Sequence, residues 1–191
     1  EDPRIVELEG ELYLCVACRM FPPGPYWLRD DPMQCAPPWA ASGGHPFGRA
    51  AAENVTVSVV FKIFPDALKR RNYEETFAYV AALTNPELGD NRDVFLFPEK
   101  LTIDGRPRYV TLHRPWQGEL YPGGRKGMPA SIWIAGADRI EDLPTHGENL
   151  ILAEPLFDWE GSRIGASWPP LRISPNEWLL AYHGKKDSSI G

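Results

Sequence analysis

The chain has 191 residues with a formal net charge of −6, and 24% of its residues are charged. This composition is ordinary for a folded, water-soluble domain, and the acidic balance argues against nucleic-acid binding, which usually needs a basic excess. No apolar run approaches the roughly 20 residues of a membrane-spanning helix. Twenty prolines, 17 glycines and 12% aromatic residues favour an all-β fold of short strands and many turns.

The three cysteines are an odd number, so we do not expect a disulfide framework. Cys15 and Cys18 have CxxC spacing, but they lie in or beside the apolar run 12–17, and a zinc site would need a second pair. The sequence therefore predicts small apolar packing residues and no metal site. With no visible signal peptide and few cysteines, we expect a cytoplasmic protein.

A hairpin pattern recurs along the chain. Each unit consists of a proline, a strand, a turn rich in Gly, Pro or Asn and a second strand, which is a typical hairpin signal. The three predicted units pair residues 3–8 with 12–16, 98–103 with 109–113, and 170–173 with 178–183.

The segments between these hairpins complete the pattern. We predict strands at 55–62 and 77–83 around one short helix at 65–76, and further strands at 131–135 and 149–152. An antiparallel unit repeated every several tens of residues is typical of a β-propeller.

Residues 21–52 interrupt the repeat with a Pro-, Gly- and Ala-rich insertion that contains Trp27 and Trp39. Long loops in compact domains are usually functional or disordered. We treat residues 1–191 as one partial domain of about three blades. Three blades do not close a propeller, so we expect the chain to be a piece of a longer one.

Fixed cations stand beside the strands of two of these segments. Arg92 and Arg114 flank one hairpin, and Arg163 and His183 flank another. Apolar strands do not need arginines at their ends, so the sequence predicts a local anion site in an acidic protein. Guanidinium groups suit phosphate because they bind its oxygens bidentately and stay charged.

Four motifs occur together in a fixed order. They are Glu-Asp-Pro-Arg at 1–4, the run 91–100 with Leu-His-Arg-Pro at 112–115, the run 163–170, and Tyr-His-Gly at 182–184. The ordered set resembles glycoside hydrolase family 130, the β-mannoside phosphorylases and β-mannosidases. The resemblance covers most of the chain except the insertion, and it implies a five-bladed β-propeller.

The resemblance also implies an activity and roles for individual residues. It implies an inverting, glycosyltransferase-type phosphorylase that cleaves a β-linked mannoside with inorganic phosphate and gives α-mannose 1-phosphate. Phosphate is then a co-substrate, and no cofactor is needed. By the same resemblance, Asp2 is the general acid, and the phosphate-binding residues are Arg92, Arg114, Arg163 and His183.

Substrate-binding candidates are Arg4, Asp93, Glu99 and Lys100. Each residue also has a plainer explanation. Asp93 could simply orient Arg92, and Asp2 beside a proline could be only a turn residue. Position 163 is arginine where the family more often has lysine, which changes the geometry of the donors but keeps the charge.

Two other functions remain open from the sequence. A β-mannosidase would use water in place of phosphate and needs a second carboxylate as base. A non-catalytic carbohydrate-binding propeller fragment would bind sugars on tryptophans, although Trp116, Trp133 and Trp178 could equally fill a β core. The expected partners are a β-mannoside oligosaccharide and phosphate, with no nucleic acid and no membrane, and the resemblance is compatible with a homo-oligomer.

Overall fold

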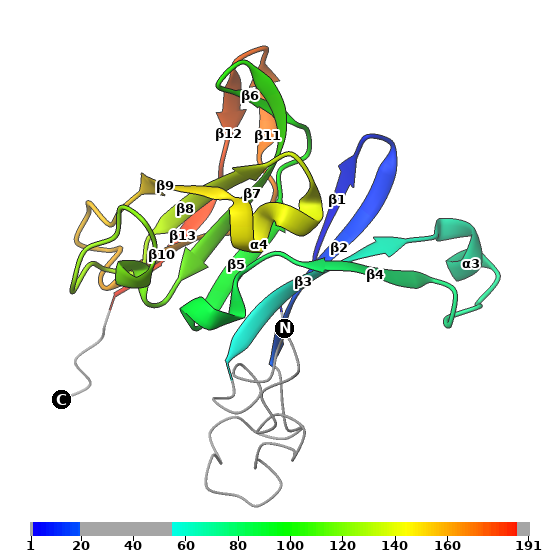
Figure 1. The fold of residues 1–191 in the computed structure, drawn as a ribbon, viewed down its shortest axis with the longest axis horizontal. Helices are drawn as coiled ribbons and strands as arrows, with labels where there is room; N and C mark the ends of the chain where they lie inside the picture. The colour runs from blue at the N-terminus through cyan, green and yellow to red at the C-terminus, as the bar shows by residue number, and fades with distance from the viewer. Residues whose placement is uncertain (1, 20–54, 187–191) are drawn as a thin grey trace, which may run out of the picture.

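The computed structural model describes residues 2–19 and 55–186, so the predicted insertion at 21–52 lies outside the described residues. β-Strands dominate the described part of the chain, and its helices are single turns (Figure 1). The prediction of an all-β fold is therefore confirmed. The helical segments are α3 (Pro65–Lys69), η2 (Pro86–Leu88), η3 (Gly118–Leu120), η4 (Ile140–Asp142) and α4 (Leu143–His146).

The first sheet is a four-stranded antiparallel meander in the order β1-β2-β3-β4. Glu9 and Gly10 join its first two strands with φ of 54° and 79°, as the favoured two-residue hairpin turn requires. The predicted helix at 65–76 is shorter than expected, because only the α3 turn forms. The strands are β1 (Arg4–Leu8), β2 (Glu11–Arg19), β3 (Thr56–Ile63) and β4 (Phe77–Ala82).

The second sheet repeats this meander in the order β5-β7-β8-β9, and a short strand, β6, pairs with the start of β7. The predicted partner of 109–113 was 98–103, but the second half of β7 pairs instead with β5. The long strand β7 therefore serves two neighbours in turn. The strands are β5 (Asn91–Leu96), β6 (Leu101–Ile103), β7 (Arg106–Pro115), β8 (Ile132–Ala137) and β9 (Glu148–Ala153).

The last part of the described chain forms two strand pairs, β10 with β13 and β11 with β12. The sequence predicted one strand over 178–183, but the structure ends β12 at Leu179 and starts β13 at Tyr182. The break lets the chain return to β10. The strands are β10 (Arg163–Ala166), β11 (Leu171–Ser174), β12 (Glu177–Leu179) and β13 (Tyr182–Lys185).

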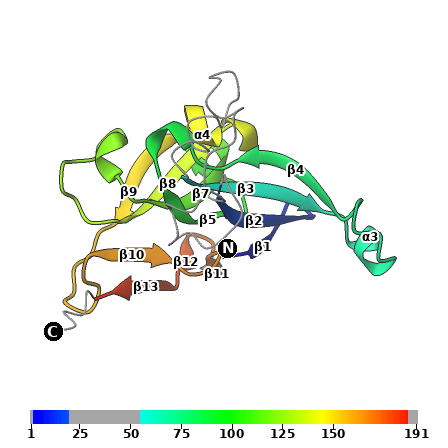
Figure 2. The ribbon, with the colours of Figure 1, turned by 90° about the horizontal axis from the view of Figure 1, so that it is seen from below.

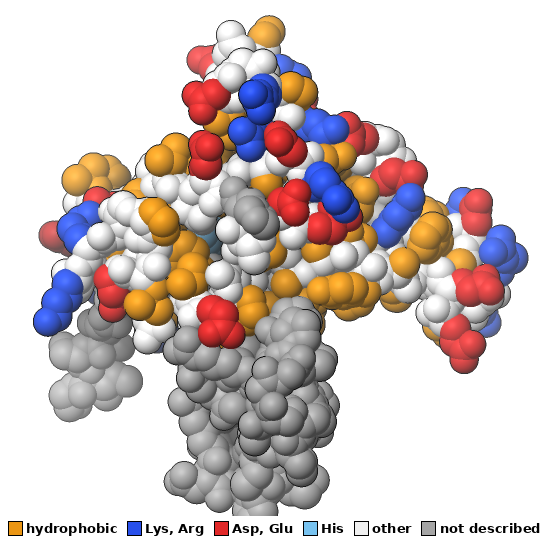
Figure 3. All heavy atoms as spheres, viewed as in Figure 1, with side chains coloured by type: hydrophobic (Ala, Val, Ile, Leu, Met, Phe, Trp, Pro, Cys, Tyr) orange, Lys and Arg blue, Asp and Glu red, His pale blue; other side chains and the backbone are white. Residues whose placement is uncertain are grey.

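The hairpin of β6 with β7 and the hairpin of β11 with β12 project together from the molecule (Figure 1). Phe97 meets Trp178 edge to face with 4.5 Å between ring centroids, and Arg172 Nη1 lies 2.9 Å from Glu99 Oε2. Acidic and basic side chains are interspersed on this projection (Figure 3). The two hairpins therefore support each other, and they tie the second sheet to the strands that follow it.

One core joins the sheets. It draws buried side chains from both meanders and from β10, including Leu8, Val60, Phe95, Leu112 and Ile164. Figure 2 shows β10 and β13 along one side of the larger sheets.

Cys15 also belongs to this core. Burial raises the pKa of its thiol to about 12, so it remains a neutral packing group, as expected. Within residues 2–19 and 55–186, no three His, Cys, Asp or Glu side chains are grouped so that they could hold a metal ion. The described part also contains no helix long and apolar enough to cross a membrane.

Two successive four-stranded meanders match the blade pattern expected from the sequence, and the first strands of the sheets approach one another. Arg4 on β1 lies 3.3 Å from Asp93 on β5, and its Nε donates to the carbonyl of Ser167, which follows β10. The closed five-bladed propeller stays a prediction.

The contribution of the shared core can be measured at Leu112, which is 1% exposed. We expect Leu112→Ala to lower the free energy of unfolding by about 2–5 kcal/mol, through lost burial and the cavity left behind. The matched change Leu156→Ala, at a side chain that is 81% exposed, should change it by less than about 0.5 kcal/mol. Urea unfolding of both variants tests this, and equal losses would contradict the assignment of the core.

Candidate functional site

A pocket of about 300 Å³ lies where three strands from different parts of the chain meet. Its lining is mainly cationic and consists of Asp90, Arg92, Arg114, Trp116 and Arg163. The arginines come from β5, β7 and β10. The structure therefore brings together three of the four cations that the sequence singled out.

Arg92 and Arg114 are direct neighbours across the β5–β7 ladder. Like charges at such positions repel each other and destabilise a sheet. The register of the ladder shifts directly after this pair. Arg92 Nη2 also reaches Thr56 Oγ1 at 3.4 Å. A bound anion would offset the repulsion that remains.

Among the described residues, Asp90 is the one carboxylate that lines this pocket. Its Oδ1 accepts a hydrogen bond of 2.6 Å from the backbone N–H of Thr56 at the start of β3. This carboxylate is therefore committed in part to joining the first two sheets. Three guanidinium groups line the pocket beside this one carboxylate, so its lining is mainly cationic.

Trp116 lies beside two of the arginines. The guanidinium carbon of Arg114 is 5.8 Å from its ring centroid, and that of Arg163 is 5.3 Å away. Both distances are within the range of a cation–π contact. The indole is 51% exposed, so it borders the pocket and does not fill the core, whereas Trp133 is fully buried. Residues two apart in a strand point to the same face. Trp116 follows Arg114 by two positions, so the sequence carried a signal for this placement.

Asp93 lies behind the pocket and contacts two arginines and a histidine. Arg114 Nε donates to its Oδ2 at 2.6 Å, Arg4 Nη2 donates to its Oδ1 at 3.3 Å, and His183 Nε2 lies 3.5 Å from Oδ2. Asp93 has a φ of 52°, in the left-handed region that aspartate tolerates better than most residues. It also falls within the register shift of β5, and such bulges often re-aim a side chain.

β10 carries a glycine, Gly165, two residues after Arg163, and the packing around it explains why. A Cβ at this position would stand 2.0 Å from Asp93 Oδ2 and 3.0 Å from Arg114 Nε. Any larger residue would therefore separate the ion pair. In the sequence this glycine stands out only as part of the motif at 163–170, which gives no sign of the close approach.

A second buried group supports the backbone of Arg114 from below. The side-chain oxygen of Asn91 accepts from the Arg114 N–H at 3.1 Å, and its Nδ2 lies 2.9 Å from Tyr121 Oη and 3.0 Å from His113 Nδ1. Burial lowers the pKa of His113 to about 4 and raises that of Tyr121 to about 12. Both groups are therefore neutral near pH 7.

The remaining predicted residues are placed differently. Asp2 is exposed, and its backbone carbonyl accepts from Arg4 Nη1 at 3.1 Å, so it lies next to the cationic cluster. His183 does not line the pocket but joins it through Asp93. Its side chain is 48% exposed.

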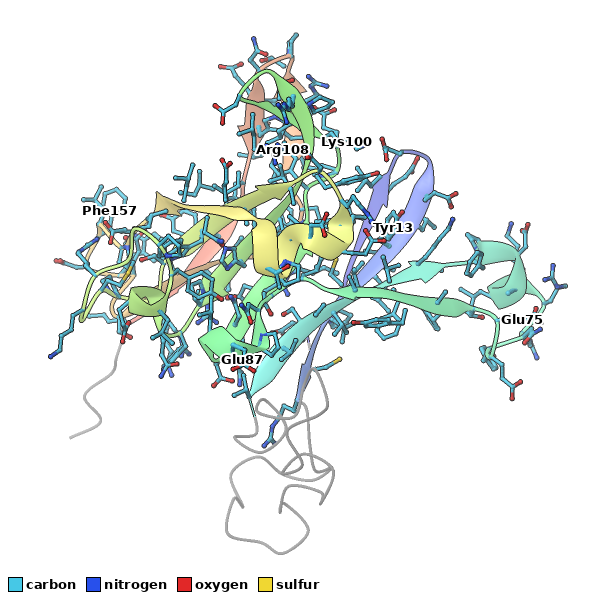
Figure 4. The ribbon with its side chains drawn as sticks, in the orientation of Figure 1. Tyr13, Glu75, Glu87, Lys100, Arg108 and Phe157 are labelled. Atoms are coloured by element: carbon cyan, nitrogen blue, oxygen red, sulfur yellow. The ribbon has the colours of Figure 1, made fainter. Side chains whose placement is uncertain are left out.

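Glu99 and Lys100 lie outside the pocket. Glu99 pairs with Arg172 on the projecting hairpins. Lys100 Nζ lies 2.7 Å from Glu9 Oε1, and Figure 4 places it on the projection close to Arg108. The hydrogen bond between Lys100 and Glu9 raises the pKa of Lys100 and lowers that of Glu9. The structure therefore does not bring these two predicted substrate-binding residues to the arginines.

The chain matches no family model, but it is similar to two characterised enzymes. It is 31% identical over 124 residues to a β-1,2-mannobiose phosphorylase from Listeria innocua serovar 6a, an alignment that covers 65% of this chain and 30% of the relative. It is 34% identical over 107 residues to a β-1,4-mannooligosaccharide phosphorylase from Ruminococcus albus, covering 56% of this chain and 28% of the relative.

The chain is a homologue of mannoside phosphorylases. The resemblance drawn from the motifs is confirmed at this level. Each alignment spans less than a third of the relative's length. Homology over this length does not by itself assign an activity to the whole protein.

The buried histidine beneath the pocket makes stability depend on pH. Its folded pKa of about 4 lies below the ordinary histidine value of 6.5, so the unfolded chain binds the extra proton between these values. Stability should therefore fall as pH falls from about 6.5 towards 4, with a loss near 2 kcal/mol between pH 7 and pH 5.

Urea unfolding at both pH values, compared with His113→Gln, isolates this contribution. We expect the variant to lose less stability than the parent by about that amount. An unchanged pH dependence in the variant would contradict the assignment.

Proposed function

We propose that this protein belongs to glycoside hydrolase family 130 and acts as an inverting phosphorylase on a β-linked mannoside, on a five-bladed propeller of which the described sheets are part. The observation that carries the proposal is a pocket in which Arg92, Arg114 and Arg163 meet, in a homologue of mannoside phosphorylases. Inorganic phosphate is the co-substrate of the proposed reaction, which needs no other cofactor.

The pocket has the chemistry that phosphate requires. Guanidinium groups are planar, permanently charged and able to donate two parallel hydrogen bonds to an oxyanion. Three of them around one space create a local positive potential in a chain whose net charge is −6. Such a site attracts a small dianion while the acidic surface disfavours polyanions.

The proposed reaction needs one protein carboxylate as acid. A phosphate oxygen attacks the anomeric carbon from the face opposite the leaving group, and the bond from that carbon to the glycosidic oxygen breaks. A proton from Asp2, passed through a sugar hydroxyl as the family resemblance implies, reaches the leaving oxygen. Phosphate takes the place of the water and base of an inverting hydrolase. The exposed Asp2 lies two residues before Arg4, whose Nη1 donates to the backbone carbonyl of Asp2, and Arg4 in turn contacts Asp93, so the chain near Asp2 is held close to the arginine cluster.

A direct test is to incubate the protein with β-1,2-mannobiose or β-1,4-mannobiose, with and without inorganic phosphate. The proposal expects α-mannose 1-phosphate and free mannose in equal amounts, only when phosphate is present. Release of two mannose molecules without phosphate would indicate a mannosidase. Sugar binding with no turnover would indicate a binding module, and either result would overturn the proposal.

The role of the pocket can be tested by removing one charge from it. We expect Arg163→Gln to raise the KM for phosphate by about 10- to 100-fold, because it removes charge-assisted hydrogen bonds, and to change the KM for mannoside much less. The matched control is Arg139→Gln, at an exposed arginine that pairs with Glu141. Steady-state kinetics with phosphate varied should leave the control unchanged, and equal effects of the two substitutions would argue against the pocket.

A further inference from the structure

We propose that Asp93 is a positioning residue of the phosphate pocket, which holds the Arg114 guanidinium by its Nε and does not itself bind sugar. This inference rests on the proposed function, because it takes phosphate to be the ligand of the three arginines. It gives Asp93 a different role from that of the substrate-binding carboxylate predicted from the sequence.

The carboxylate of Asp93 already has partners within the protein on both of its oxygens. Oδ1 accepts from Arg4, and Oδ2 accepts from Arg114 and lies 3.5 Å from His183. The side chain is only 6% exposed. The carboxylate is thus nearly closed to solvent and already has three partners within the protein, so most of its bonding capacity is directed inwards.

Asp93 holds Arg114 by one atom of its guanidinium group, Nε. Among the described residues, the side-chain hydrogen bond to Arg114 is made at Nε, and Nη1 is buried with no hydrogen-bond partner. Guanidinium carries five N–H donors in a fixed plane. Fixing that plane at Nε leaves the Nη donors for another acceptor, and Arg114 lines the pocket.

The backbone around Asp93 and Arg114 also fits this role. Asp93 takes a positive φ inside a register shift of β5, and a side chain at Gly165 would collide with both partners. Strained backbone conformations persist where the surroundings enforce them, often at functional sites. Both β5 and β10 are therefore shaped to keep this carboxylate against Arg114.

Side chains from β1 and β13 support Asp93 from the other side. Arg4 Nε donates to the Ser167 carbonyl at 2.9 Å, and Ser167 Oγ lies 3.3 Å from His183 Nδ1. Arg4 and His183 thus share Asp93 as well as Ser167. Asp93 fixes the relative places of the cations, and through Arg114 it sets the geometry of the pocket.

The kinetic test uses Asp93→Asn, which keeps the shape of the side chain and removes its charge. We expect the KM for phosphate to rise by about 10- to 100-fold, with the KM for mannoside changed less than about twofold and kcat largely recovered at saturating phosphate. The matched control is Asp138→Asn, which removes the charge of an exposed carboxylate paired with Arg108. Equal changes in both KM values would point to a merely structural role and overturn the inference.

A double-mutant cycle tests whether Asp93 acts through Arg114. If it does, Asp93→Asn should weaken phosphate binding, measured by calorimetry with inorganic phosphate, far less in an Arg114→Gln background than in the parent. Additive effects would overturn the inference. If the parent protein itself binds no phosphate, the proposed function fails. If the parent and Asp93→Asn bind phosphate equally, only the positioning role fails.

A measurement on the unaltered protein keeps the inference testable if the variants do not fold. The Arg114 Nε–H, bonded at 2.6 Å to a buried carboxylate, should give a slowly exchanging signal in a ¹H–¹⁵N spectrum. Titration with inorganic phosphate should leave this signal in place and shift the Nη signals of the same residue. Loss of the Nε–H signal on phosphate addition would mean that phosphate displaces Asp93, and it would overturn the inference.

Discussion

The buried carboxylate of Asp93 is the point at which three separately hydrogen-bonded groups of strands are joined. Arg4 belongs to the first sheet, Arg114 to the second, and His183 to the pair formed by β10 and β13. A buried charge without partners is very costly, and removing one partner of such a pair typically costs about 3–5 kcal/mol. The cations therefore have a structural reason to meet at this place, whether or not a ligand is present.

The same constraint explains how an acidic chain maintains a cationic pocket. Arg92 and Arg114 are placed opposite each other on neighbouring strands, an arrangement that a sheet would otherwise avoid. Trp116 beside two guanidinium groups and Asp90 at the margin reduce the repulsion without cancelling the charge. The remaining positive potential is available to an anion.

Local chemistry made several elements predictable from the sequence. The pairs Glu9–Gly10 and Asp104–Gly105 favour tight hairpin turns, and all four residues adopt the positive φ that such turns need. The alternation of exposed and partly buried residues in β9 likewise reflects side chains that point in turn to the two faces of a strand. The arginines were noticed because they stand at the ends of apolar strands, where burial offers no reason for them.

Other features depend on tertiary contacts that no local pattern records. The division of β7 between two partners, and the return of the chain to β10 at Tyr182, follow from which strands lie nearby. The close approach at Gly165 and the half-exposed indole of Trp116 arise only when distant segments meet. The proposal of phosphate as the anion came from the resemblance to a family, because a cationic pattern alone does not distinguish phosphate from another anion.

The hydrogen bond from Arg4 to Ser167 spans 163 residues of the sequence. Contacts of such range form late and slowly, because a long loop must lose its freedom before the contact gives anything in return. The two meanders can form from local hairpins, whereas the cluster around Asp93 needs both ends of the described chain in place. The pocket is therefore complete only once β10 has joined the two sheets, because β10 supplies Arg163.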